Sequence, residues 1–188
     1  MAFGENIKDS LKILFFNETS LIKVSNNASA TGYGFLTLVI AGIAMWISSF
    51  FSDLALTPII FFVTKNFILL ILIPIALIIG VFIEYSIYHF IAKFILGGQA
   101  TGIQYFRSLS NSFIIFWFTF VPFIGVILQY IAWGWLIIIN IFILHKVHKL
   151  SLAKAIILGL VPIIIVLVLV GAIAYFGSFD LSGSFSPQ

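Results

Sequence analysis

Long apolar runs separated by short polar segments dominate this chain. They cover residues 35–51, 67–90, 112–128, 131–144 and 155–176. A helix needs about 20 mostly apolar residues to cross the hydrocarbon core of a bilayer, so each run is a candidate span. The pattern predicts an all-α, polytopic membrane helix bundle, in which residues 35–176 form one domain of five transmembrane helices.

The division between the third and fourth spans requires an argument, because residues 113–144 are almost continuously apolar. As a single helix they would be about 48 Å long, whereas the hydrocarbon core is only about 30 Å thick. Two short passes that turn near Gln129 and Tyr130 fit the bilayer better. Pro122 and Gly125 would then loosen the third span.

The positive charges support this division and give an orientation. With five spans, eight of the nine lysines and arginines lie on the side of the N-terminus, and only Lys65 lies on the other side. Merging the third and fourth spans would reduce the bias to five against four. Because cytoplasmic loops are enriched in lysine and arginine, we expect the N-terminus in the cytoplasm and the C-terminus outside.

The two ends of the chain differ from the spans. Residues 1–34 are predicted to be an inner interfacial amphipathic segment, with residues 25–34 as a linker. Its apolar helix face would hold Phe3, Ile7, Leu11, Leu14 and Phe15, and its polar face Glu5, Lys8, Asp9 and Lys12. Residues 177–188 are rich in serine and glycine and are predicted to be a flexible outer tail.

Local signals mark three element boundaries. Asn17 is a candidate helix cap, and Gly97 with Gly98 is a candidate helix stop. Thr101 followed by Gln104 is a candidate capping box at the start of another inner-surface helix.

Composition restricts the function classes. The chain is 62% hydrophobic and 8% charged, against about 25% charged residues in ordinary soluble domains. Its solvent must therefore be lipid. A net charge of +3 spread over separate loops does not indicate nucleic-acid binding. There are no cysteines and no HExxH, GxSxG, Walker A or CxxC motif, so we expect no enzyme activity, no cofactor and no metal.

A polar sector on the second span is the one candidate for ion chemistry. Glu84 and Tyr88 lie four residues apart on one helix face, and Tyr85 and His89 form the adjoining face. A charged residue within a membrane costs roughly 2.5–3.5 kcal/mol even on lenient scales, so Glu84 suggests a proton relay or cation site. The alternative is a structural role, in which Glu84 reaches the interface or pairs with a neighbour.

Two further groups of residues have expected roles. We expect an anionic headgroup-binding or anchoring role at the inner surface for Arg107, His145, Lys146, His148 and Lys149. We expect helix packing from the small and polar residues Thr37, Ala41, Ala44, Ser48 and Asn140. Packing within the bundle is favoured over a homo-oligomer contact for the small-residue face, and hydrogen bonding between helices is favoured for Asn140.

Three sequence features, in this order, carry a resemblance to a known family. They are residues 96–102 (LGGQATG), a span containing Val121-Pro122, and residues 147–155 (VHKLSLAKA) before the last span. With the five-span layout, this order resembles the Yip1 domain family over nearly the whole chain. The resemblance implies a membrane bundle, and the short loops suggest a prokaryotic member in the cell membrane.

The functional content of the resemblance is limited. Eukaryotic members act in vesicle trafficking, some bind Rab GTPases, and they carry an Asp-Leu-x-Gly-Pro motif near the first span. Here Asp53-Leu54 is followed by Ala55-Leu56-Thr57, so Rab binding is not carried over. We expect a non-enzymatic membrane organiser that binds other membrane proteins or lipids. The alternative is a small channel or transporter using Glu84, Tyr88 and His89.

Overall fold

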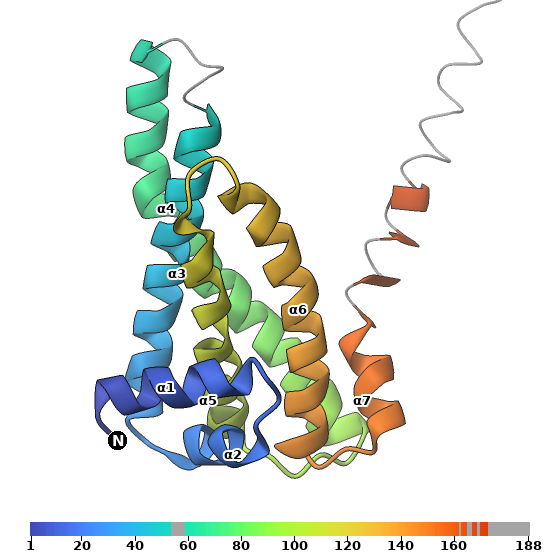
Figure 1. Ribbon diagram of the computed structural model, residues 1–188. Coiled ribbons are helices and arrows are strands. Elements are labelled where there is room, and N and C mark those ends of the chain that lie inside the picture. The colour runs from blue at the N-terminus through green and yellow to red at the C-terminus, as the bar shows by residue number, and fades with distance from the viewer. Residues whose placement is uncertain (54–58, 162, 165–166, 169, 173–188) are drawn as a thin grey trace, which may run out of the picture.

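The computed structural model describes residues 1–53, 59–161, 163–164, 167–168 and 170–172. Over these residues the chain consists of helices and short connections, without a strand. Three long helices run along one another in Figure 1: α3 (Ala30–Asp53), α4 (Ile59–Phe90) and α6 (Gly125–Lys146). The predicted all-helical class is confirmed.

Three stretches of the described chain are long and apolar enough to cross a membrane: Ala30–Phe51, Asn66–Ile95 and Gly125–Lys146. They indicate a membrane protein. They correspond to the first, second and fourth predicted spans, although the first and fourth helices begin earlier than predicted. The predicted linker over residues 25–34 is therefore shorter, because α3 has already started at Ala30.

The third predicted span is not a continuous α-helix. The chain runs through α5 (Gly102–Ser112) and a 3-10 helix, η2 (Phe113–Phe120), then turns and enters α6. The turn lies at residues 121–124, so the predicted turn at Gln129 and Tyr130 is wrong. Pro122 breaks the helix, and Phe123 adopts a left-handed φ of 67°. A Cβ on Gly125 would collide with the Thr119 carbonyl, so glycine permits the tight reversal.

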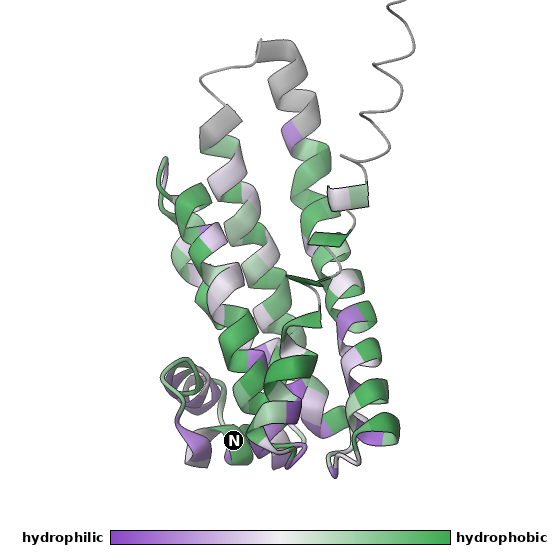
Figure 2. Ribbon diagram, turned by 90° about the vertical axis from the view of Figure 1, so that its right-hand side faces the viewer, coloured by the Kyte–Doolittle hydropathy of each residue, from purple (hydrophilic) through white to green (hydrophobic). Residues whose placement is uncertain are grey.

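Figure 2 shows hydrophilic residues gathered at the end of the bundle that holds the N-terminus, below long helices that are mainly hydrophobic. There, α1 (Phe3–Ile13) lies across the long helices and is followed by α2 (Glu18–Asn26). We call this assembly the end platform; it comprises residues 1–29, residues 96–101 and residues 147–151. The helices of the predicted interfacial segment are present, whereas their position at a membrane surface remains a prediction.

The side chain of one charged residue of α1, Asp9, is not on the exposed polar face that the amphipathic pattern predicted. Asp9, predicted on the outer polar face, is buried between α1 and α2. Its carboxylate accepts a hydrogen bond from Ser20 at 3.0 Å and forms an ion pair with Lys23 at 2.8 Å. Lys23 also pairs with Glu5 at 2.7 Å. The partner cation on α2 makes burial of the Asp9 side chain tolerable.

The predicted boundary signals are confirmed. The Asn17 side chain caps α2 by accepting a hydrogen bond from the Ser20 amide at 2.8 Å. α4 continues into a short π-helix, η1 (Ile91–Ile95), and Gly97 follows with a φ of 79°. The capping box of Thr101 and Gln104 starts α5.

The last apolar segment is described without a gap only as far as residue 161. α7 (Leu152–Gly159) is capped by the Ser151 side chain and packs against α6. The predicted fifth span thus begins within a helix, while its end at residues 173–176 and the predicted tail at 177–188 lie outside the described residues.

Candidate functional site

The predicted polar sector faces the protein interior along α4. Glu84 and Tyr88 point toward α6 and line a cavity of about 330 Å³ with Leu109, Trp133, Leu136, Ile137 and Asn140. Glu84 and Trp133 also line a neighbouring cavity of about 390 Å³ whose other walls are apolar side chains. No hydrogen bond or ion pair joins the Glu84 carboxyl to another residue in the described part of the chain.

The adjoining face of α4 enters an aromatic and histidine cluster, which contains Tyr85, His89, Tyr105 and His148. The Tyr85 ring is stacked on Tyr105 with centroids 6.0 Å apart. His89 Nδ1 lies 3.4 Å from His148 Nε2. The cluster thus joins α4 to α5 and to the loop after α6.

Asn140 links this cluster to the Glu84 cavity. Its side-chain oxygen accepts a 2.7 Å hydrogen bond from the buried hydroxyl of Tyr105. This bond connects α5 with α6, which agrees with the expected role of Asn140 in holding helices together.

His148 is fully buried, and its expected headgroup-binding role is therefore wrong. Its backbone carbonyl accepts a hydrogen bond from the Gln99 amide at 2.9 Å, and its ring points inward. A Cβ on Gly98 would lie only 2.6 Å from His148 Nδ1, so glycine makes room for this ring. Burial, followed by the nearby charges of His89 and Lys93, lowers the pKa of His148 to about 4, so the ring is neutral at pH 7.

The other residues expected to bind headgroups mostly have partners within the protein. Arg107 donates to Thr31 at 2.8 Å and to the Ser25 carbonyl at 3.3 Å. Lys146 is paired with Glu18 at 2.7 Å. His145 Nδ1 lies 2.8 Å from the Leu150 carbonyl. Lys149 is exposed at the surface of the end platform.

The small-residue face of α3 is buried in the bundle. Thr37, Ala41, Ala44 and Ser48 are each at most 4% exposed. The indole of Trp117 on η2 donates to the Thr37 carbonyl at 3.2 Å. Gly125, which starts α6, lies so close to Ser48 that a Cβ there would be 2.5 Å from the Ser48 hydroxyl. These contacts agree with the expected packing within one chain.

The structure also brings the two loops that flank this site together. Besides the bond from Gln99 to His148, the Lys154 ammonium donates to the Leu96 carbonyl at 3.1 Å. Sequence reasoning assigned neither Tyr105 nor Trp133 to the site, because both are far from Glu84 along the chain. No group of three or more potential metal ligands of the His, Cys, Asp or Glu type occurs among the described residues.

Searches against models of known protein families, curated proteins and solved structures find no match to this chain. The resemblance to the Yip1 domain family therefore remains a prediction.

Proposed function

We propose that this chain is a non-enzymatic integral membrane protein with five spans, which binds other membrane proteins or lipids at its end platform. The observation that carries the proposal is the structure of this platform. Antiparallel helices can be joined by roughly 2–8 residues, whereas residues 1–29 add two helices, α1 and α2, at the bundle end. A surface of this extent is more than the connections require.

The platform is held by bonds between segments that are distant in sequence. The Asn6 amide donates to Asn111 at 2.7 Å, joining α1 to α5. The Gln104 amide donates to Asn26 at 2.8 Å, joining α5 to α2. Such contacts fix the relative positions of the helices, which lowers the entropy cost of binding a partner to their outer surface.

The five-span topology and the family resemblance belong to the same proposal. α5 and η2 together rise roughly 32 Å at the ideal spacings of their helix types, which is enough to cross the hydrocarbon core. The contacts between residues 96–99 and residues 148–154 support the resemblance, since they join two of the segments that carry it.

Site-specific photo-crosslinking in native membranes tests the proposal. We would place a photoreactive amino acid at exposed Thr19 on α2, and at exposed Ile79 on the lipid-facing side of α4 as a matched control. A discrete heterologous protein or lipid adduct from position 19, and only diffuse lipid labelling from position 79, is the expected result. Equal labelling from both positions would refute a binding role for the end platform.

A second candidate function is supported by the unpaired carboxyl of Glu84 in its cavity. A small channel or transporter could use Glu84, Tyr88 and His89 to bind a proton or cation. The walls of the larger cavity oppose this function, because Met45, Ile73 and Leu77 provide no polar groups beyond Glu84. Flux of protons and monovalent cations into liposomes decides between the candidates: flux lost in Glu84→Gln but kept in Asn26→Leu would favour transport.

A further inference from the structure

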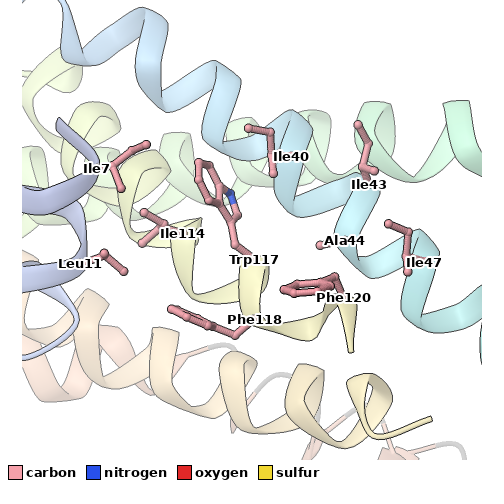
Figure 3. Close-up of a pocket in the computed structure, with 10 residues that line it drawn as sticks. All are labelled: Ile7, Leu11, Ile40, Ile43, Ala44, Ile47, Ile114, Trp117, Phe118 and Phe120. Atoms are coloured by element: carbon pink, nitrogen blue, oxygen red, sulfur yellow. The ribbon is translucent and has the colours of Figure 1, made fainter. Parts of the chain in front are cut away.

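A groove separate from the two cavities beside Glu84 lies on the opposite side of α3 from α4, and aliphatic and aromatic side chains line it. Its volume is about 470 Å³, and α1, α3 and η2 form its walls. Figure 3 shows the lining residues strung along it, from Ile7 and Leu11 on α1 to Ile47 and Phe120 at the far end. We call this the α1 groove.

The α1 groove runs along the helices rather than across them. From Ile40 to Ile47 it follows α3 for about 10 Å, and from Ile114 to Phe120 it follows η2 for about 12 Å. This is about a third of the hydrocarbon thickness of a bilayer. An extended hydrocarbon chain entering at α1 would therefore point toward the middle of the membrane.

Two lysines of α1, Lys8 and Lys12, lie next to the end of the groove that α1 forms. A shallower depression of about 340 Å³ shares Ile7 and Leu11 with the groove and is also lined by Lys8, Lys12 and Phe15. Lys8 and Lys12 are one helical turn apart and both are exposed. Neither forms an ion pair or hydrogen bond in the described part of the chain, whereas Lys23 nearby is held by Glu5 and Asp9.

We infer that the α1 groove is a binding site for an anionic phospholipid. One acyl chain occupies the apolar channel beside Trp117, and the phosphate-bearing headgroup lies against Lys8 and Lys12. The combination of charge and shape selects this ligand: a zwitterionic lipid would gain little from two free cations, and a soluble anion would not use the apolar channel. This inference specifies the lipid part of the proposed function, but it does not depend on a protein partner.

Quenching of tryptophan fluorescence by lipids with brominated acyl chains tests the site. The full chain is purified into nanodiscs of phosphatidylcholine, and brominated phosphatidylglycerol or brominated phosphatidylcholine is added in increasing mole fraction. The part of the quenching that disappears in Trp117→Phe reports occupancy of the groove. We expect this Trp117 component to reach half its maximum at a lower mole fraction of brominated phosphatidylglycerol than of brominated phosphatidylcholine. The difference should be at least about tenfold, since each lysine contributes about a fivefold preference for the anionic lipid.

Matched variants assign the effect to the groove. Lys8→Gln with Lys12→Gln should remove the preference, whereas Lys93→Gln with Lys154→Gln, which deletes two charges elsewhere at the same end of the bundle, should keep it. Ile43→Phe should fill the channel and abolish the Trp117 component, and Ile79→Phe on the exposed face of α4 should not.

Two outcomes would overturn the inference. Equal quenching by both brominated lipids, unaffected by the lysine substitutions, would mean that only bulk lipid fills the groove. The preference for the anionic lipid could also be lost in Lys93→Gln with Lys154→Gln but kept in Lys8→Gln with Lys12→Gln. That result would place the anionic lipid outside the α1 groove. Because the assay uses purified protein, its failure would leave the photo-crosslinking test of the end platform unaffected.

Discussion

Asn111 holds the end platform to the bundle, and replacing it by leucine should loosen α1. The Asn111 side chain is fully buried. Its oxygen accepts a hydrogen bond from Asn6 at 2.7 Å, and its nitrogen donates to the carbonyls of Ala30 at 2.9 Å and Arg107 at 2.8 Å. Its oxygen also accepts a longer hydrogen bond from the Ser10 hydroxyl at 3.5 Å. Asn111→Leu keeps a similar volume but removes all four bonds, which isolates the role of hydrogen bonding.

The expected loss of stability follows from these contacts. The Asn6 amide would be left as a buried donor with only a marginal contact to Ser10 at 3.5 Å, which costs about 1–3 kcal/mol. The two lost bonds to carbonyls add a smaller amount, because both carbonyls lie in helices. A total of about 2–4 kcal/mol corresponds to a fall in melting temperature of roughly 4–16 °C for a chain of this size.

The assay is thermal unfolding in detergent–lipid micelles, combined with hydrogen exchange of the α1 backbone amides. The matched control is Asn26→Leu, because the Asn26 amide is bonded but exposed, and its loss should cost less than about 0.5 kcal/mol. An unchanged melting temperature in Asn111→Leu would refute the assigned role of the amide. So would destabilisation without faster exchange in α1.

Three other predictions follow from the packing, the pH response and the topology. Gly42→Ala should destabilise the protein by about 1–3 kcal/mol, because the added Cβ would lie 2.5 Å from the backbone of α4. Gly80→Ala should be neutral or stabilising, because a Cβ there has nothing within 4 Å, and the melting temperatures of the two variants measure the difference. Burial lowers the pKa of His148 to about 4, so the unfolded chain binds a proton at this histidine more readily than the folded chain does. The free energy of unfolding should therefore fall as the pH drops from about 6.5 toward 4, and this fall should be smaller in His148→Phe. Five spans predict that cysteines at Thr19 and Phe123 react with an impermeant maleimide from opposite sides of the membrane, and labelling from one side would contradict that topology.

Local signals predicted much of the fold. The long apolar runs located α3, α4 and α6, since any segment of that length and composition must bury its backbone polar groups in a helix. The cap at Asn17, the stop at Gly97 and the capping box at Thr101 each depend on residues within a few positions. The turn at residues 121–124 was misplaced, because an apolar run has no polar residue to mark a reversal. Pro122 and Gly125 therefore predicted only a loosening of the third span.

The errors in the site came from contacts between distant segments. His148 stands between lysines, so its sequence context suggested the surface. The left-handed φ of 56° at Lys149 reverses the chain there, and the His148 ring turns inward against His89. Asp9 fits the polar face of α1, but only the position of Lys23 on α2 explains its burial. Neither partner can be inferred from periodicity within one helix.

The hydrogen bond from Gln99 to His148 has a consequence for synthesis of the protein. It closes a loop that contains α5, η2 and α6, so the end of the bundle cannot be sealed until residue 148 has emerged from the ribosome. Because chains fold from the N-terminus as they are made, α3 and α4 must wait in the membrane with the His89 side chain lacking its neighbour. In the intermediate that precedes closure, polar groups of α4 therefore still lack the neighbours that the later part of the chain supplies.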